Sequence, residues 1–488
     1  MLFFKNTFNH ASLFLLSQTE IIQHTMHYDI IVIGSGPGGY VAAIRASQLG
    51  LKTAVVEKAE LGGICLNWGC IPTKALLKSA QVFQYMKHAA DYGIKSEGGF
   101  SPDFEAIVKR SRDVAAGMSN GIQYLFKKNK VEQIKGFGKV KPGKTVEVTA
   151  EDGTLTTYSA NHIIIATGAR SRQLLNLPQD GVKIIGYREA MTLPKLPESM
   201  VVVGSGAIGS EFAHFYNSLG TKVTLVEFLP SIVPLEDEEV SKQLERSFKK
   251  AGMKVMTDSS VESVDTTGDK CKVLIKTKKG EETLEVDIVL SAVGIATNIE
   301  GIGLEETGIK TERGKVLVDE YFRTNVDGYY AIGDIVPGPA LAHVASHEGI
   351  ICVEKIAGHH PQPMNYGNIP GCTYTHPEVA SVGLTEKAAR EAGREIKVGK
   401  FPFTASGKAS AAGNKDGFIK VIVDAQYGEI LGAHMIGDNV TEMIAEIVVA
   451  RKLESTGREL IDAVHPHPTM SEAVMEAMAA AYGEVVHI

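Results

Sequence analysis

Two stretches of this chain align without gaps at an offset of 170 residues, and this internal repeat constrains the fold more than any other feature. The first stretch covers residues 28–58 and the second covers residues 199–228. Each opens with a short apolar run beside glycines, which is typical of a buried parallel strand. A helical stretch, a second strand and an acidic residue follow in both. The sequence therefore predicts two copies of one strand–helix–strand unit.

Each copy carries the pattern G-x-G-x-x-G between its first strand and its helix. These glycines are Gly34, Gly36 and Gly39 in the first copy, and Gly204, Gly206 and Gly209 in the second. The first glycine of such a pattern permits a tight turn, the second lets the backbone approach a pyrophosphate, and the third lets helix and strand pack closely. The helix N-terminus offers unpaired N–H groups to the phosphates. One such pattern often marks only a glycine-rich turn, but two complete units in register predict two dinucleotide sites.

The second strand of each copy ends in an acid, Glu57 or Glu227, 18 residues beyond the last glycine. A carboxylate at this place accepts hydrogen bonds from the ribose hydroxyls of a dinucleotide. A 2′-phosphate would be repelled by Glu227, and the adjacent residues are Val226 and Phe228 rather than an arginine. The second site is therefore predicted to prefer NAD over NADP.

Composition narrows the class of protein. A length of 488 residues suggests about three domains. The net charge of −7 argues against a nucleic-acid-binding surface, and no run of 18 apolar residues is present that would span a membrane. The five cysteines are too few for a secreted disulfide scaffold. A close pair of cysteines in such a chain is expected to be catalytic or metal-binding.

Residues 62–74, GGICLNWGCIPTK, hold that pair, Cys65 and Cys70, and helical composition follows over 74–89. Zinc needs three or four ligands, and the residues between the cysteines offer no such set, so no metal site is expected. If the stretch is helical, the two cysteines would face nearly the same side and a small disulfide ring could close. A redox-active disulfide is favoured over an inert pair, and a helix start with a nearby cation would hold one sulfur as thiolate.

GGICLNWGCIPTK resembles the active-site signature of the flavin disulfide reductases, the pyridine nucleotide–disulfide oxidoreductase family. The resemblance runs from about Tyr28 to the C-terminus. It implies FAD in the first dinucleotide unit and NAD in the second. It implies that Cys65 exchanges with substrate, and that Cys70 lies against the flavin as a thiolate. Lys74 resembles the family lysine near the flavin ring, and Glu211 the acid that pairs with it from the NAD domain.

Three further segments resemble parts of the family's FAD site. The strand at 163–170 ends in Thr167 and Gly168, where the chain leaves the FAD domain. The segment 324–335 ends in Gly333 and Asp334, and the resemblance implies that this carboxylate binds the ribitol of FAD. The segment 341–349 resembles the helix beneath the flavin ring. Its first residues, Ala342 and His343, are assigned to FAD together with Gly138, and Gly294 is assigned to NAD.

The chain departs from the family at one place. Many members carry G-R-x-P-N after the NAD domain, whereas residues 294–298 here are GIATN. This departure leaves the local contacts of the segment open, but it does not touch the residues assigned to the chemistry.

The C-terminal segment supplies a candidate base. His467 begins the pattern H-P-T-x-x-E, and Glu472 ends it. This pattern resembles the family's base and its orienting acid, because a carboxylate partner fixes the tautomer and favours the charged imidazole. His465 is the less favoured alternative. In the family this base reaches the flavin site from the neighbouring subunit, so the resemblance implies a homodimer. The apolar helical stretch 442–453 could belong to the core or to the dimer surface.

The predicted fold class is α/β, with two Rossmann-like dinucleotide-binding domains and a C-terminal α+β dimerisation domain. The expected limits are 26–172 for the FAD domain, 173–296 for the NAD domain, 297–365 for a segment that returns to the FAD domain, and 366–488 for the dimerisation domain. Residues 1–25 are predicted to be an extension upstream of a start at Met26, in preference to a targeting peptide.

Within the family the chain most resembles the NAD-dependent members that oxidise dihydrolipoamide. This implies as partners the lipoyl domains of 2-oxo acid dehydrogenase complexes or of the glycine cleavage system. A cytoplasmic location is expected, or the mitochondrial matrix in a eukaryote. A glutathione-reductase-like sibling is the first alternative, although it would need an NADP pocket. The second alternative is a flavoprotein scaffold or redox sensor that does not turn over.

Overall fold

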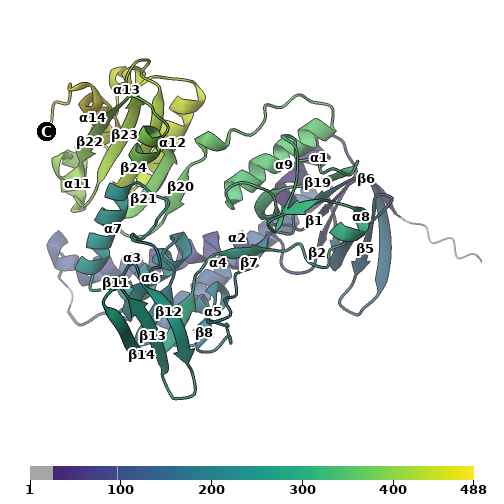
Figure 1. Ribbon diagram of the computed structural model, residues 1–488, viewed down its shortest axis with the longest axis horizontal. Coiled ribbons are helices and arrows are strands. Elements are labelled where there is room, and N and C mark those ends of the chain that lie inside the picture. The colour runs from purple at the N-terminus through teal and green to yellow at the C-terminus, as the bar shows by residue number, and fades with distance from the viewer. Residues whose placement is uncertain (1–25, 96) are drawn as a thin grey trace, which may run out of the picture.

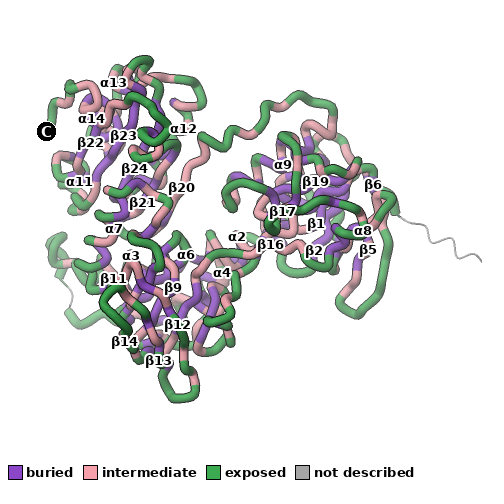
Figure 2. The backbone as a smooth tube through the Cα atoms, in the orientation of Figure 1, coloured by how far each residue is buried: buried purple, intermediate pink, exposed green. Residues whose placement is uncertain are grey.

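The computed structural model describes residues 26–95 and 97–488 of the chain. The predicted extension, 1–25, lies outside the described residues. The ribbon shows three bodies: an N-terminal sheet with its helices, a middle body built mainly from the teal segment, and the yellow-green C-terminal body (Figure 1). Buried residues are concentrated along the strands inside each body (Figure 2). The predicted α/β fold with two Rossmann-like units is confirmed.

The first body is built on a mainly parallel sheet. Its strand order is β3-β2-β1-β6-β5-β4, with β19 paired to β6. The strands are β1 (His27–Ile33), β2 (Thr53–Glu57), β3 (Glu132–Lys135), β4 (Phe137–Lys141), β5 (Thr145–Thr149), β6 (Leu155–Ile165) and β19 (Tyr329–Ala331). Helix α1 (Pro37–Gln48) joins β1 to β2, as the repeat predicts. Helix α9 (Ala342–Ile356) packs on α1, so a segment far along the chain completes this body.

The second copy of the repeat forms the middle body. Its sheet is parallel throughout, with the order β11-β10-β9-β15-β8. The elements are β8 (Ile184–Ile185), β9 (Ser199–Val203), α6 (Ala207–Leu219), β10 (Lys222–Val226), α7 (Glu238–Lys250), β11 (Lys254–Met256) and β15 (Ile288–Ser291). An antiparallel sheet lies beside it, formed by β12 (Ser260–Asp265), β13 (Cys271–Thr277) and β14 (Gly280–Val286).

The chain enters and leaves the middle body side by side. Strand β7 (Ala169–Ser171) pairs antiparallel with β16 (Ile295–Thr297). Between β16 and β19 lie three short elements, α8 (Leu304–Thr307), β17 (Thr311–Glu312) and β18 (Lys315–Val316). The middle body is therefore an insertion between two parts of the first.

The C-terminal body is an antiparallel sheet covered by helices, in the order β20-β21-β24-β23-β22. The strands are β20 (Gly371–Thr373), β21 (Glu378–Gly383), β22 (Ile396–Pro402), β23 (Phe418–Asp424) and β24 (Ile430–Gly437). The helices are α10 (Glu386–Glu391), α11 (Gly407–Ala412), α12 (Val440–Lys452), α13 (Gly457–Asp462) and α14 (Glu472–Tyr482). Side chains alternate along a strand, so Ile419, Val421 and Val423 share one core with α12 and α14. Phe418 and Lys420 face the middle body.

One apolar core links a helix of the N-terminal segment, the middle body and the C-terminal sheet. It joins Leu76 of α3 (Cys70–Lys87) to Phe215 and Leu244 of the middle body and to Phe418 of the C-terminal sheet. Helix α3 follows the short α2 (Gly63–Asn67) and packs on α4 (Phe104–Lys128). A continuous close-packed core fixes how neighbouring bodies sit against one another. Within the described residues, no helix is both long and apolar enough to cross a membrane.

The contact between β22 and α14 yields a test of the C-terminal packing. A Cβ atom on Gly399 would lie 2.0 Å from the carbonyl oxygen of Ala477, whereas one on Gly407 would meet nothing within 4 Å. Because overpacking costs roughly 1–3 kcal/mol, Gly399→Ala should lower the thermal unfolding midpoint by several degrees, measured by circular dichroism. Gly407→Ala is the matched control and should unfold as the wild type does. Equal midpoints for both variants would contradict this packing.

Candidate active site

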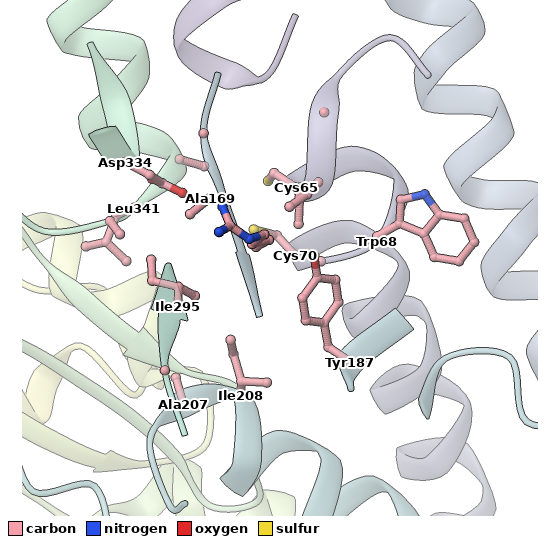
Figure 3. Close-up of a pocket in the computed structure, with 18 of the residues that line it drawn as sticks. Cys65, Trp68, Cys70, Ala169, Tyr187, Ala207, Ile208, Ile295, Asp334 and Leu341 are labelled. Carbon is pink, nitrogen blue, oxygen red and sulfur yellow. The ribbon is translucent and has the colours of Figure 1, made fainter. Parts of the chain in front are cut away.

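A cavity of about 1940 Å³ opens between the three bodies. All of the predicted site residues line it except Gly39, Gly209, His467 and Glu472. Figure 3 shows how Cys65 and Cys70 lie on one side of the cavity, with Asp334, Ile295, Ala207 and Ile208 on the other sides. The two glycine patterns and the cysteine pair, which are far apart in sequence, therefore share one space.

In both patterns the second and third glycines have different roles, as the spacing predicts. A Cβ on Gly39 would lie 1.9 Å from the carbonyl oxygen of Gly34, and one on Gly209 would lie 1.9 Å from that of Gly204. These third glycines are therefore required for helix–strand packing and do not line the cavity. A Cβ on Gly36 would meet no protein atom within 4 Å, and the same holds at the second copy's Gly206. That open space at a helix N-terminus fits a pyrophosphate at each copy.

The two acids at the strand ends are held in the same way. Glu57 Oε2 accepts from the backbone N–H and the hydroxyl of Ser35 at 2.9 and 2.7 Å, and Oε1 accepts from Ala59 N at 2.9 Å. Glu227 repeats this with Ser205 at 2.8 and 2.7 Å and with the N–H of Leu229 at 2.8 Å. Each Oε1 keeps a lone pair for a ribose hydroxyl.

These serines were missed by the sequence analysis, although both copies spell G-S-G. Their side chains fix the carboxylates that face the nucleotides. The glycine spacing, the open second glycine and the orienting serine all fit a dinucleotide at each copy, so the residues present fit FAD and NAD.

The cysteine pair does not lie on one helix. On a continuous helix, residues five apart would project about 140° from each other, so the expectation that they face the same side is wrong. The structure ends α2 at Asn67 and begins α3 at Cys70, with Trp68 and Gly69 between them. A Cβ on Gly69 would lie 3.4 Å from the Cα of Cys65. The break thus brings the start of α3 close to Cys65.

Cys65 and Cys70 both line the cavity as unbridged cysteines. Their pKa values move in opposite directions. A hydrogen bond from the Cys65 thiol, with the charge of Lys74 in addition, lowers the pKa of Cys70 against the effect of burial. The same hydrogen bond, together with burial, raises the pKa of Cys65. These opposed directions favour Cys70 over Cys65 as the sulfur that ionises first.

Lys74 lies at the centre of the site. Its Nζ donates to both oxygens of Glu211, at 3.0 and 2.8 Å, and Glu211 is buried in α6. Glu211 Oε1 also accepts from the backbone N–H of Tyr374 at 3.0 Å, and Lys74 Nζ lies 4.2 Å from the centroid of the Tyr374 ring. The predicted pairing of Lys74 with Glu211 is thus present in the structure, and a residue of the C-terminal body that sequence analysis missed completes it.

Asp334, which the resemblance assigns to the ribitol of FAD, lines the cavity. Figure 3 shows Asp334 directed toward the cavity. Burial raises its pKa, and the charge of Lys315 opposes that rise. The loop is held by Glu348, which sequence analysis did not single out. It accepts from Gly333 N at 2.6 Å and from the Tyr366 hydroxyl at 2.7 Å, and burial raises its pKa to about 7.

The segment that departs from the family pattern keeps its anchoring asparagine. Asn298 donates from Nδ2 to the carbonyl oxygen of Thr167 at 3.0 Å and from its backbone N–H to that of Gly168 at 2.8 Å. The hydroxyl of Thr167 donates back to the carbonyl oxygen of Asn298 at 2.6 Å. Arg170 pairs with Glu300 at 3.0 Å beside them. GIATN therefore still ties the returning chain to the cavity wall.

The candidate base lies away from the cysteines of its own chain. His467 Nδ1 is 2.8 Å from Glu472 Oε1, and Glu472 Oε2 accepts from Thr469 N at 2.8 Å. The imidazole of His467 is 79% exposed and does not line the cavity. His465 differs, because its Nε2 lies 2.7 Å from Glu446 and its side chain is only 8% exposed. His467 is thus oriented by a carboxylate and accessible to solvent, and it does not line the cavity that holds the cysteines of its own chain.

Two aromatic residues beside the cysteines were also missed. Trp68, the chain's one tryptophan, lies between the guanidinium groups of Arg112 and Arg188, at 4.5 and 4.9 Å from the ring centroid. Tyr187 of α5 (Tyr187–Ala190) points toward Cys70 (Figure 3). No spacing rule connects these residues, so only the fold brings them together. Among the described residues, no group of three or more His, Cys, Asp or Glu side chains could hold a metal ion.

Comparisons with known proteins agree with this geometry. Residues 28–349 match the family model described as pyridine nucleotide-disulphide oxidoreductase, and residues 369–478 match the dimerisation domain of that family. The chain belongs to this family. Dihydrolipoyl dehydrogenase of Rhizobium etli is 50% identical over 476 residues, covering 94% of this chain and 99% of that protein.

Two other relatives extend this picture. Dihydrolipoyl dehydrogenase 1, mitochondrial, of Arabidopsis thaliana is 43% identical over 94% of this chain and 91% of its own length. The crystal structure of LpdA from Mycobacterium tuberculosis superposes with a TM-score of 0.87 at 28% identity, covering 93% of this chain and all but 1% of its own. Similarity thus extends through all three bodies.

The hydrogen bond between the cysteines yields a test by thiol reactivity. Cys65→Ala removes the donor that contributes most to lowering the pKa of Cys70, so alkylation of Cys70 by iodoacetamide should shift to higher pH. Cys65→Ser keeps a hydroxyl donor and should shift the profile less. The rate of alkylation against pH, followed by mass spectrometry, measures both. Identical profiles for the two variants would contradict the assigned hydrogen bond.

The paired serines yield a second, internally controlled test. Because a hydrogen bond to a charged group contributes about 1.5–3 kcal/mol, Ser205→Ala should weaken NAD binding by roughly tenfold and leave the FAD content unchanged. Ser35→Ala should weaken FAD binding and leave NAD affinity intact in protein reloaded with FAD. Flavin absorbance and calorimetry measure the two affinities. Each variant is the control for the other, and a loss at the wrong nucleotide would refute the assignment of the two copies.

Proposed function

We propose that this member of the pyridine nucleotide-disulphide oxidoreductase family is a dihydrolipoyl dehydrogenase, which oxidises protein-bound dihydrolipoamide and passes the electrons to NAD⁺. One observation carries the proposal: a cysteine pair with opposed pKa shifts lies in a cavity that two dinucleotide sites share. Close relatives over nearly the whole length carry that name. The flavoprotein scaffold alternative would not need the oriented pair of His467 and Glu472.

The reaction begins with proton transfer from the substrate. His467 of one subunit takes a proton from a thiol of dihydrolipoamide, while Glu472 holds the imidazole in the required tautomer. The resulting thiolate attacks Sγ of Cys65 in the Cys65–Cys70 disulfide, and Cys70 leaves as thiolate. The second substrate thiol then attacks the substrate sulfur of the mixed disulfide, so that lipoamide closes its ring and leaves, and its proton passes to Cys65, which departs as a thiol.

The Cys65–Cys70 disulfide must then form again, and this requires the cofactors. Bound FAD would supply the two-electron chemistry that links the cysteine pair to NAD⁺. The chain's own contribution is electrostatic: Lys74 favours the thiolate of Cys70, and the Cys65 thiol donates to it. Glu57, Gly36 and Asp334 would hold FAD, and Glu227, Gly206 and Gly294 would hold NAD.

The base and the cysteines come from different subunits in this proposal. His467 is exposed and lies outside the cavity of its own chain. The C-terminal body matches a dimerisation domain. A homodimer in which each His467 faces the partner's cavity therefore completes two equivalent sites, as closed two-fold symmetry requires.

The proposed partners follow from the substrate. Dihydrolipoamide is carried on lipoyl domains, so we place this enzyme with a 2-oxo acid dehydrogenase complex or with the glycine cleavage system. We place it in the cytoplasm, or in the mitochondrial matrix if the source is eukaryotic; one relative carries a mitochondrial name.

NADH formation tests the proposed function directly. FAD-loaded protein given dihydrolipoamide and NAD⁺ should produce NADH, followed at 340 nm, and NADP⁺ should support little turnover because Glu227 repels a 2′-phosphate. His467→Gln should lower turnover by roughly 100-fold or more, since general-base catalysis contributes about 10²–10⁴-fold. A wild type that reduces its flavin with NADH but does not oxidise dihydrolipoamide would refute the substrate and favour another disulfide reductase.

A further inference from the structure

Residues 228–237 follow Glu227, the acid of the NAD site, and hydrogen bonds hold this segment at several points. Leu229 donates from N to Glu227 Oε1 at 2.8 Å, and Val233 donates from N to the carbonyl oxygen of Ser205 at 3.1 Å. Asp237, at the far end, caps α7 by accepting from the N–H of its second residue at 3.0 Å. The position of this segment is therefore linked to the two residues that face the nucleotide.

The first copy of the repeat makes the same backbone contact to its serine, one residue earlier after its acid and with a glycine. There Gly62 donates from N to the carbonyl oxygen of Ser35 at 3.0 Å, as Val233 does to Ser205. Gly62 has a φ of +94°, and Val233 has a φ of +39°. Glycine adopts positive φ freely, whereas a β-branched side chain disfavours it. The bend in the second copy is therefore strained, and contacts elsewhere must hold it.

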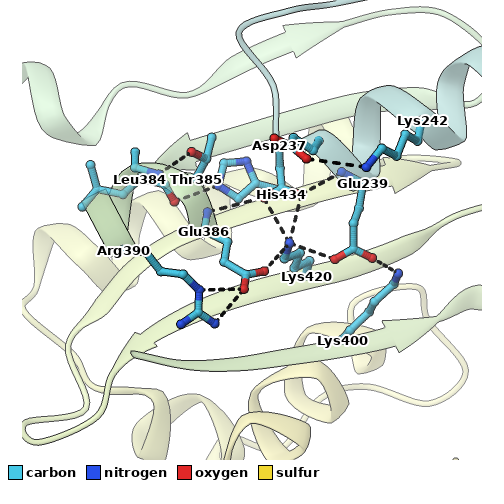
Figure 4. Close-up of polar contacts among 12 residues, drawn as sticks. Asp237, Glu239, Lys242, Leu384, Thr385, Glu386, Arg390, Lys400, Lys420 and His434 are labelled. Carbon is cyan, nitrogen blue, oxygen red and sulfur yellow. Dashed lines mark hydrogen bonds and ion pairs between the residues drawn. The ribbon is translucent and has the colours of Figure 1, made fainter. Parts of the chain in front are cut away.

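Lys420 of the C-terminal sheet supplies such contacts. Its Nζ lies 3.0 and 3.1 Å from the two carboxylate oxygens of Asp237, 2.9 Å from Glu239 and 2.8 Å from Glu386 (Figure 4). Its side chain is 2% exposed and lies on the face of β23 opposite to Val421. The ammonium group therefore bridges two carboxylates of the middle body and one of the C-terminal body.

The outward-facing carboxylate oxygens of Glu239 and Glu386 are paired with cations as well. Lys400 pairs with the second oxygen of Glu239, and Arg390 donates to the second oxygen of Glu386 at 3.0 and 2.7 Å. Three cations thus face three carboxylates. Among the ion pairs of the described residues, Lys420 is the only cation that contacts Asp237, and it does so from the buried side. A buried charge that loses its partner is strongly destabilised, so Asp237 depends on Lys420 more than the other two acids do.

We propose that Lys420 is a positioning residue for the NAD site. By holding Asp237, it keeps residues 228–237 in the strained bend that presents Ser205 and Glu227 to the ribose and the pyrophosphate. The C-terminal body is then a structural part of nucleotide binding as well as of the dimer. This inference rests on the proposed function for the identity of the nucleotide, NAD.

The test measures NAD⁺ binding to the FAD-loaded dimer by calorimetry, beside the steady-state constants. Lys420→Met should raise the dissociation constant and the KM for NAD⁺ by about tenfold. The KM for dihydrolipoamide and the rate of flavin reduction by dihydrolipoamide should stay within about twofold of the wild type. Lys400→Met removes a cation from the rim of the same cluster and is the matched control, with wild-type NAD⁺ affinity.

A second substitution separates positioning from general stability. Val233→Gly in the Lys420→Met background relieves the strained bend, and it should recover most of the lost NAD⁺ affinity. If Lys420→Met does not assemble with FAD, Asp237→Asn keeps the cap oxygen, removes the charge that Lys420 holds, and should show the same loss. Unchanged NAD⁺ affinity in the folded variants, or equal losses for both substrates without rescue by glycine, would overturn the proposal. Because calorimetry needs no dihydrolipoamide, failure of the proposed substrate would be seen separately.

Discussion

The ion pair between Lys74 and Glu211 is the interaction on which the site depends. Lys74 stands on the helix that begins at Cys70, Glu211 on the helix of the second repeat, and Tyr374 of the C-terminal sheet donates to the same carboxylate. A buried carboxylate is tolerated only where it is paired and hydrogen-bonded. The pair joins α3 to α6, the C-terminal body adds a hydrogen bond to Glu211, and the same arrangement places the cation that lowers the pKa of Cys70 beside the cavity.

The internal repeat explains how one chain builds two different sites from one plan. Both copies hold their acid through a serine and turn back through the same backbone contact. They diverge beyond that turn. In the first copy the chain passes through Gly62 directly into the redox cysteines, whereas in the second it passes through Val233 to the cap of α7 and the cluster around Lys420. The two copies therefore share the way they hold the acid. The chain beyond it leads to the redox cysteines in the first copy and to the supports of the NAD site in the second.

Local patterns predicted the fold and both nucleotide cradles because glycine spacing and a terminal acid act over a few tens of residues. The break between α2 and α3 was missed, although Gly69 lies within it and glycine is a poor helix former. Lys420 gave no signal because its partner Asp237 lies 183 residues away, and pairing over that separation depends on the packing of two bodies. His467 was found only through its resemblance to a family pattern, since it does not line the cavity that holds the cysteines of its own chain.

The most direct test of this account is the activity of a mixed dimer. One chain carries Cys65→Ser and the other His467→Gln, with different affinity tags so that only the mixed species is purified. If each site combines the cysteines of one subunit with the histidine of its partner, one intact site remains, and the mixed dimer should retain about half of the wild-type turnover although both parent dimers are inactive. A mixed dimer as inactive as its parents would show that His467 serves the cysteines of its own chain.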